Sequence, residues 1–226
     1  QGAQYVGMGK DVAEAFPSAA EMYNKANDIL GYDLKKICFD GPAEQLNTTT
    51  ISQPAIFTTS AAILEVFRNS PATSSINPDV TAGLSMGEYT ALYAAGLVSF
   101  EDGLKLVQKR GQAMQAAADA GSGSMVSIIG LDEQKVQQLC EQARQSEILE
   151  AVNFNCPGQI VISGSKTACE RAEKLAEKYG AMKAVRLEVA GAFHTEMMDS
   201  AAKSISEALS TCKIAEPAKL KVIANI

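Results

Sequence analysis

The chain has 226 residues, 46% of them hydrophobic and 20% charged, which is enough apolar material for a large core with a subdomain and excludes a disordered tail. Its 20 Lys and Arg against 26 Asp and Glu give a formal net charge of −6 with no long basic run, so nucleic acid is not an expected partner. No stretch approaches the ~20 apolar residues of a membrane span, and the start lacks a signal-peptide pattern, so no membrane association is expected.

The first half of the chain is predicted to be mainly helical. Pro17 at a first helical position and Gly31 just past the end bound one helix, and Pro54 is taken as the start of another. Ser99 followed by Asp102 resembles a capping box. The expected elements are helices over 17–30, 54–68, 88–95 and 100–118, a surface loop over 70–79, and a short buried strand over 80–83.

From Gly121 onward strands and helices alternate. We expect strands over 125–129, 149–154, 159–163 and 182–189, helices over 132–145 and 166–179, and a turn at Cys156-Pro157-Gly158. The order β-α-β-β-α-β is typical of a ferredoxin-like unit. Residues 120–189 are therefore predicted to be an inserted subdomain, after which a helix over 195–210 and a strand over 220–224 return to the first domain.

A serine lies in a G-x-S-x-G motif, Gly83-Leu84-Ser85-Met86-Gly87, between the predicted strand and the helix over 88–95. In that context the glycines would allow close backbone packing while Ser85 is held in a strained turn at a helix N-terminus, where free amides stabilise developing negative charge. An ordinary Gly-Ser-Gly turn would give the same letters, but the strand and helix around it favour a nucleophile.

A serine hydroxyl needs a base, and His194, the only histidine, stands between a predicted strand and a predicted helix. No carboxylate is placed as its partner, because Glu196 and Asp199 follow too closely on one helix. The five cysteines are scattered without a C-x-x-C pair, which argues against disulfides and a zinc site and fits a reducing compartment. We expect no metal.

Arg110 lies near the apolar face of the helix over 100–118, while Lys105 and Lys109 point away. A guanidinium turned inward needs an anion. That anion is either a protein carboxylate or the carboxylate of a substrate, in which case Gly111 would keep the approach clear.

Six segments together resemble the malonyl-CoA:acyl carrier protein transacylases of fatty-acid synthesis, a family that includes the acyltransferase domains of polyketide synthases. They are Gln1-Gly2-Ala3-Gln4, Gln53-Pro54-Ala55, Gly83 to Tyr89, Gln108-Lys109-Arg110-Gly111, Asn153 to Gln159, and Gly191-Ala192-Phe193-His194. The resemblance covers the whole chain and implies an α/β fold, with a large α/β-hydrolase-like domain (1–119 and 190–226) and the ferredoxin-like insertion (120–189).

The resemblance also implies roles. Ser85 is the expected nucleophile and His194 its base, oriented by a backbone carbonyl rather than an acid. The amides of Gln4 and Met86 would form the oxyanion hole. The substrate would contact Arg110, which would pair with the malonyl carboxylate, together with Gln53, Leu84, Asn153 and Phe193. Phe193 leaves little room for a branched acyl chain, so malonyl is expected over methylmalonyl.

The expected partners are malonyl-CoA and acyl carrier protein, whose phosphopantetheine thiol accepts the acyl group, with no cofactor on the enzyme and a monomeric state. Lys166, Arg171, Lys174 and Lys178 form either an ordinary solvated helix face or a basic face for the acidic carrier. Leu84 stands where most members have His, a form found in photosynthetic lineages, so the compartment is a bacterial cytoplasm or a plastid stroma.

The family pattern also begins before Gln1 and continues past Ile226, so we expect the large domain to be incomplete at both ends, with the residue that orients His194 outside the chain. Two other interpretations stay open. A serine hydrolase would use the same serine motif and histidine without needing Arg110. A carrier-docking module would need none of these three catalytic features.

Overall fold

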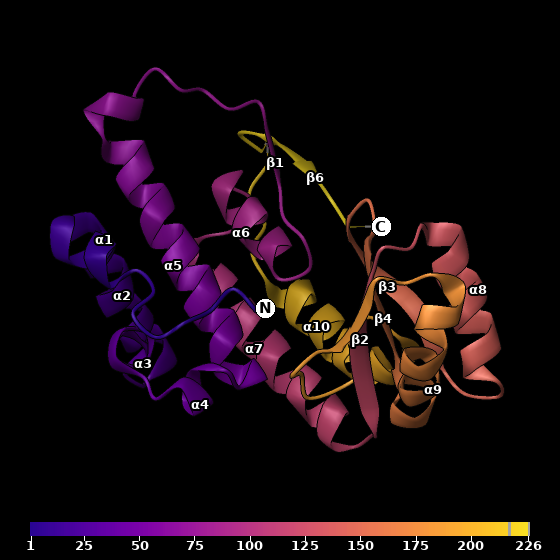
Figure 1. Ribbon diagram of the computed structural model, residues 1–226. Helices are drawn as coiled ribbons and strands as arrows, with labels where there is room; N and C mark the ends of the chain where they lie inside the picture. Colours follow the sequence, from indigo (N-terminus) through magenta and orange to yellow (C-terminus); the bar gives the residue numbers. More distant parts are fainter. Residues whose placement is uncertain (217, 226) are drawn as a thin grey trace. The chain divides into compact units, whose positions relative to one another are not determined.

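The computed structural model describes residues 1–216 and 218–225, and the chain forms two compact units of mixed α/β structure (Figure 1). Unit 1 consists of Gln1–Gln112 and Ser204–Ile226, and unit 2 of Ala113–Lys203. Two helices cross the boundary between them, α7 (Phe100–Asp119) and α10 (Asp199–Thr211). Among the described residues, none of the helices is both long and apolar enough to cross a lipid bilayer.

Unit 1 is built mainly of helices around one apolar core. They are α1 (Lys10–Ala15), α2 (Pro17–Leu30), α3 (Leu34–Asp40), α4 (Ala43–Leu46), α5 (Thr49–Asn69), a 3-10 turn (Pro71–Thr73) and α6 (Gly87–Ala94), followed by most of α7. Tyr23, Leu34, Phe57 and Leu104 are fully buried in this core. Gly31 ends α2 in the left-handed conformation that favours glycine, as predicted.

Helix α5 differs from its prediction, because it begins at Thr49 and not at Pro54. Pro54 lies inside the helix. Proline favours the first turn of a helix, so the predicted start was five residues too late. The earlier turn is held by the amides of Ile51 and Ser52, which donate to the carbonyl of Thr48. This extension places Gln53 on the helix, where it is completely buried. Helices α1, α3 and α4 were not predicted.

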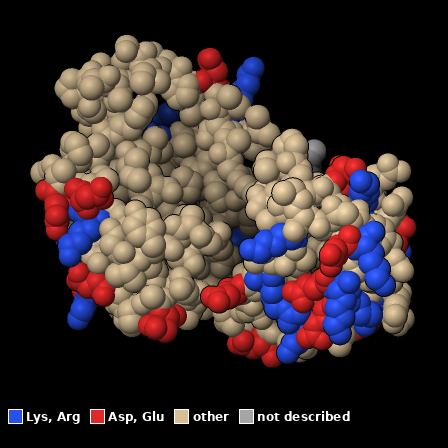
Figure 2. Space-filling model, in the orientation of Figure 1, with Lys and Arg blue, Asp and Glu red and all other residues tan. Residues whose placement is uncertain are grey.

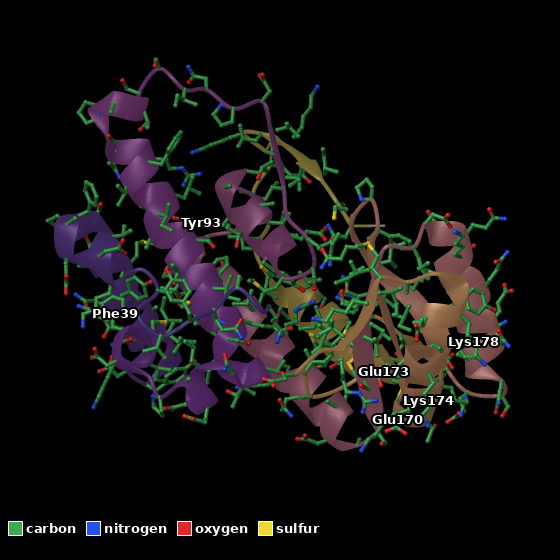
Figure 3. The ribbon with its side chains drawn as sticks, in the orientation of Figure 1. Phe39, Tyr93, Glu170, Glu173, Lys174 and Lys178 are labelled. Carbon is green, nitrogen blue, oxygen red and sulfur yellow. The ribbon has the colours of Figure 1, made fainter. Side chains whose placement is uncertain are left out.

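An aromatic cluster joins α5, α6 and α7. The ring of Phe57 on α5 lies 5.8 Å from that of Phe100 on α7 and 6.0 Å from that of Tyr93 on α6, labelled in Figure 3. Gly103 allows this approach, because a Cβ there would lie 2.6 Å from the Phe57 ring. The predicted capping box at the start of α7 is confirmed, since Ser99 Oγ accepts from the Asp102 amide at 3.0 Å.

Strand β1 (Val80–Ala82) pairs in parallel with β6 (Lys221–Ile223), with Val80 opposite Lys221 and Ala82 opposite Ile223. The prediction of a buried strand was wrong, because Val80 is 48% exposed. The reason is pairing: in the described part of the chain, β6 is the only strand bonded to β1.

Unit 2 contains a four-stranded antiparallel sheet in the order β3-β4-β2-β5. Its elements are β2 (Gly123–Ile129), α8 (Glu133–Arg144), β3 (Leu149–Cys156), β4 (Gln159–Ser165), α9 (Lys166–Ala176) with a 3-10 turn (Glu177–Tyr179), and β5 (Lys183–Arg186). The predicted order of strands and helices is therefore confirmed. The last strand is shorter than predicted.

The two faces of this sheet carry two cores. Val126 and Ile128 point to one face, where α8 and α9 lie side by side (Figure 1) and complete an apolar core. Met125, one residue along the same strand, packs on the opposite face with Met114 of α7 and Met198 of a 3-10 turn (Glu196–Met198). The period of two along β2 therefore separates two apolar layers within unit 2.

Candidate active site

Ser85 lies on a sharp turn between β1 and α6 in unit 1. Its backbone is in the left-handed region at φ 53°, which is uncommon for a residue other than glycine. The amides of Gly87 and Glu88 donate to the carbonyls of Leu84 and Ser85, so a hydrogen-bonded turn at the serine leads directly into α6. The predicted strand, elbow and helix are all present.

The two glycines of the motif differ in how much space surrounds their Cα atoms. A Cβ at Gly83 would lie 2.1 Å from the carbonyl carbon and oxygen of Gly87, so no side chain fits there. A Cβ at Gly87 would meet no atom within 4 Å. The expectation that both glycines permit close packing is therefore correct for Gly83 and wrong for Gly87, whose backbone is the surface on which Gly83 packs.

Arg110 contacts the serine directly. Its Nη2 donates to Ser85 Oγ at 3.0 Å, and its Nη1 donates to Gln53 Oε1 at 2.7 Å. The guanidinium carbon also lies 5.8 Å from the centre of the Tyr89 ring, within the range of a cation–π contact. The prediction of an inward-facing arginine is confirmed, because Arg110 is 9% exposed.

The charge of Arg110 has no ion pair with a carboxylate among the residues of unit 1 that the structure describes. Burial lowers the pKa of its guanidinium. No carboxylate of the described residues lies within ion-pair distance of it. The sequence analysis offered two anions as partners of Arg110, a protein carboxylate or a substrate carboxylate. Residues 1–216 and 218–225 do not supply the protein carboxylate.

Gly111 has a different role from the one expected. A Cβ at this position would lie 2.7 Å from the carbonyl oxygen of Thr49 and 3.2 Å from the Cα of Thr50. The glycine is required because α7 packs closely on the start of α5, and not because it clears a path to Arg110. The close packing of these helices brings Arg110 to Gln53.

Of the other predicted residues of unit 1, Leu84 and Met86 flank the serine in the sequence, and Gln4 lies near the start of the chain. Met86 directly precedes α6, and its side chain is 3% exposed in the core. Leu84, on the other side of the serine, is 58% exposed. Gln4 is tied by its side chain, which donates to Asn47 Oδ1 at 3.0 Å and accepts from the Gly2 amide at 2.8 Å.

His194 lies in unit 2, in a loop that also departs from ordinary backbone geometry. Its φ is 65°. The loop before it is tightly packed: a Cβ at Gly191 would lie 2.6 Å from Ala118 Cβ, and a Cβ at Gly123 would lie 2.4 Å from the amide nitrogen of Ala192. Small residues at these positions let the loop lie directly against α7 and β2.

The two remaining predicted residues also belong to unit 2. Phe193 is 4% exposed and packs in the apolar layer that contains Met125. Asn153 lies on β3 beside an irregularity in its pairing with β4, where the register shifts between Ala151 and Asn153.

Sequence reasoning missed two residues at the elbow. Tyr89 lies one helical turn after the serine, and its ring faces Arg110. Asn225, distant in the sequence, accepts a hydrogen bond from the Ser85 amide through Oδ1 at 2.6 Å. No local pattern marks Asn225, because its role depends on the parallel pairing of β6 with β1.

The candidate basic face consists of Lys166, Arg171 and Lys174 of α9 and Lys178 of the following 3-10 turn, and acidic side chains are interspersed with basic ones over this region (Figure 2). Arg171 pairs with Glu147 and donates to the carbonyl of Ala143. Glu170 and Glu173 lie near Lys174 (Figure 3), and both acids pair with Arg186. Acidic side chains therefore interrupt the basic residues of this helix, and its contact with a carrier stays a prediction.

Within the described residues, no group of three or more His, Cys, Asp or Glu side chains could hold a metal ion.

Comparisons with known proteins place the chain in one family. The model of the acyl transferase domain family matches residues 1–225. The malonyl CoA-acyl carrier protein transacylase of Bacillus subtilis is 43% identical, over all of this chain and 70% of its own length. The crystal structure of an acyl carrier protein S-malonyltransferase from Vibrio cholerae superposes with a TM-score of 0.93 at 41% identity, covering all of this chain and 72% of that one.

A third similar structure contains a partner. It is a malonyl-transacylase in complex with a type II polyketide synthase acyl-carrier protein, with a TM-score of 0.94 and 38% identity over all of this chain and 72% of the other.

Proposed function

The chain belongs to the acyl transferase domain family, and from that premise we propose that it transfers the malonyl group of malonyl-CoA to the phosphopantetheine thiol of an acyl carrier protein. The names of its relatives support both the acyl group and the acceptor. The site in unit 1 supports the same chemistry, because it combines an elbow serine with a buried cation.

In the proposed reaction, Ser85 Oγ attacks the thioester carbonyl while His194 accepts the hydroxyl proton. The amides of Met86 and Gln4 stabilise the oxyanion, and the start of α6 adds the positive end of its dipole. The C–S bond then breaks, and the CoA sulfur leaves with the proton from His194. In the second half, the carrier thiol gives its proton to His194 and its sulfur attacks the malonyl-serine ester. The ester C–O bond then breaks, and Ser85 Oγ leaves with the proton from His194.

The observation that carries the proposal is the position of Arg110. A malonyl ester on Ser85 would place its carboxylate only a few bonds from Oγ, and Arg110 Nη2 lies 3.0 Å from that atom. A buried guanidinium without a carboxylate partner among the described residues is suited to bind a carboxylate brought by the substrate. A serine hydrolase acting on neutral esters would gain nothing from this cation. Gln53 supports the site by fixing the other end of the guanidinium.

Intact mass spectrometry after brief incubation with malonyl-CoA tests the proposal. The expected product is a malonyl adduct on the parent enzyme that maps to Ser85 and is absent from Ser85→Ala. Free malonate without a transferable adduct would indicate a hydrolase, and full function of Ser85→Ala would indicate a docking module.

The role of Arg110 is tested by comparing malonyl-CoA with acetyl-CoA. Arg110→Ala is expected to lower kcat/KM for malonyl transfer at least about 30-fold, the effect of about 2 kcal/mol from removing one partner of a desolvated charge pair. Acetyl transfer should fall much less. Lys109→Ala, an exposed neighbour on the same helix, is the matched control. Equal losses for both substrates would contradict a carboxylate-binding role.

We also propose malonyl over methylmalonyl as substrate. Phe193 supports this preference, because a bulky side chain held in a packed apolar layer can move little to admit an extra methyl group. Leu84 and Asn153 are proposed as further contacts of the substrate. Phe193→Ala should raise methylmalonyl transfer relative to malonyl transfer in a competition assay.

For the architecture, we propose an α/β-hydrolase-like large domain (1–119 and 190–226) that contains a ferredoxin-like subdomain (120–189). The strand order β3-β4-β2-β5 with all neighbours antiparallel supports the ferredoxin-like description. The parallel pair β1 and β6 and the serine elbow between β1 and α6 support the hydrolase-like description.

The reaction as proposed uses no cofactor of the enzyme, because the phosphopantetheine arrives on the carrier. We propose a monomer that works in a bacterial cytoplasm or a plastid stroma. Its five unpaired cysteines, three of them buried, are suited to a reducing compartment.

A further inference from the structure

We infer that Asn225 is a positioning residue for the nucleophile, because its side-chain amide holds the elbow in the conformation that presents Ser85. The inference rests on the proposed function, in which Ser85 carries the acyl group. In this role Asn225 does not touch the substrate or the reacting atoms. It acts through the backbone of the serine.

Three hydrogen bonds join Asn225 to three parts of the elbow. Its Oδ1 accepts from the Ser85 amide at 2.6 Å, and its Nδ2 donates to the carbonyl of Gly83 at 2.7 Å. Its backbone amide donates to Glu88 Oε2 at 3.3 Å. One residue therefore contacts the end of the strand, the serine itself and the first turn of α6.

The pairing of β1 with β6 explains why this residue reaches the elbow. The parallel register pairs Val80 with Lys221 and Ala82 with Ile223, and the same register continued places Asn225 opposite Leu84. In a parallel ladder, a residue bonds to the carbonyl before and the amide after the residue that it faces. Asn225 does this with its side chain, accepting from Ser85 and donating to Gly83.

A side-chain amide suits this position because the main chain of β1 is no longer extended there. Ser85 has φ 53°, and a strained backbone of this kind costs of order 1–3 kcal/mol unless its surroundings hold it. An amide group supplies a donor and an acceptor in one plane, which is what the Gly83 carbonyl and the Ser85 amide require. The Ser85 amide is thereby occupied, which leaves the next amide, of Met86, for the proposed oxyanion hole.

The proposed role requires a side chain at position 225 that both donates and accepts a hydrogen bond. Asn225→Leu keeps approximate size but removes both polar atoms. Asn225→Gln keeps the amide on a longer stem. Asn69→Ala is the matched control, because the Asn69 side chain also donates to a main-chain carbonyl of unit 1, that of Glu65 at 2.7 Å, far from the elbow in the sequence.

The test measures the rate at which Ser85 reacts with a small fluorophosphonate, together with kcat and KM for malonyl transfer, in the full enzyme. In Asn225→Leu we expect the fluorophosphonate rate and kcat to fall together, about 10- to 100-fold, because a displacement of the nucleophile by about 1 Å has effects of this size. KM for malonyl-CoA and the final extent of labelling should stay near parental values. Asn225→Gln should recover part of both rates, and Asn69→Ala should match the parent.

Two outcomes would overturn the inference. One is parental rates in both Asn225 variants. The other is a loss that follows only the fraction of folded protein, seen as a reduced extent of labelling at an unchanged rate; Asn225→Gln keeps the test decisive if Asn225→Leu folds poorly. Failure of the proposed function looks different, because the parent enzyme itself would then form no malonyl adduct on Ser85.

Discussion

The serine elbow of unit 1 and the histidine loop of unit 2 hold the same unusual backbone in different ways. Ser85 has φ 53° and His194 has φ 65°, and neither is a glycine. The elbow is held by hydrogen bonds, from Asn225 and from the first amides of α6. The loop is held by contact, because Gly191 lies against Ala118 and Ala192 lies over Gly123.

The difference shows how each region should respond to change. Hydrogen bonds fix the direction of the backbone groups that they join, so the elbow should be sensitive to polar substitutions and to any displacement of Gly83. Close packing fixes position through volume, so the loop should be sensitive to single added carbon atoms and should be rescued by removing one nearby. Both predicted catalytic residues carry strain of about 1–3 kcal/mol.

The largest effect is expected from Gly83→Ala. The new Cβ would lie 2.1 Å from the backbone of Gly87, and a backbone cannot rotate aside, so the elbow must open. We expect at least a hundredfold loss of acyl transfer and a loss of about 3 kcal/mol in the free energy of unfolding, measured by urea denaturation.

Gly87→Ala is the control for this prediction. Its Cβ would meet no atom within 4 Å, and alanine favours a helix by up to about 1 kcal/mol. Its stability should therefore equal or exceed that of the parent. A Gly83→Ala variant as stable and active as Gly87→Ala would contradict the elbow geometry.

A somewhat smaller effect is expected from Gly191→Ala in the histidine loop. The added Cβ would lie 2.6 Å from the Cβ of Ala118, so the loop should move away from α7 and displace His194. We expect a loss of malonyl transfer of about 10-fold or more. The double variant Gly191→Ala with Ala118→Gly removes the opposing carbon and should recover much of the rate; a double variant no better than the single one would disprove contact-based positioning.

The backbone strain at Ser85 and His194 is expected to have a smaller effect, on the free energy of unfolding, and one of similar size at both positions. At each of the two strained positions, glycine should be more stable than alanine by about 1 kcal/mol, because it adopts positive φ freely. Chemical denaturation of Ser85→Gly against Ser85→Ala, and of His194→Gly against His194→Ala, measures this. All four variants should lack acyl transfer. Alanine equal to glycine at either position would mean that no strain is stored there.

The smallest effect concerns Glu147 of unit 2. Hydrogen bonds from Thr167, Arg171 and Ser165 lower the pKa of its carboxyl to about 2. A folded pKa below the unfolded value of 4.5 means that the carboxylate contributes stability at neutral pH, and that this contribution is lost as the pH falls from about 4.5 towards 2. Because about a third of the Glu147 side chain (33%) is exposed, solvent and salt weaken the effect.

Glu147→Gln should therefore melt slightly below the parent at pH 7, and the difference should shrink through that pH range. Glu141→Gln, an exposed acid on α8, is the control. A difference in Tm that does not depend on pH would show that the carboxylate charge is not its source.

Much of the secondary structure could be predicted because its signals are local. Capping by Ser99 and Asp102, the turn at Pro157-Gly158 and the strand periodicity of residues 125–129 each depend on a few neighbouring residues. Helices α3 and α4 are too short to show a clear period, and Pro54 concealed the first turn of α5.

The sequence by itself was enough to predict Ser85, His194 and Arg110 as site residues, because an elbow motif, a lone histidine and an inward-facing cation are each visible in their local context. Only the tertiary structure decided what those side chains meet. Gln53 reaches Arg110 across 57 positions, and Asn225 reaches Ser85 across 140. Contacts of this kind follow from strand register and helix packing, in which the backbone at one end of the chain sets the position of a side chain at the other.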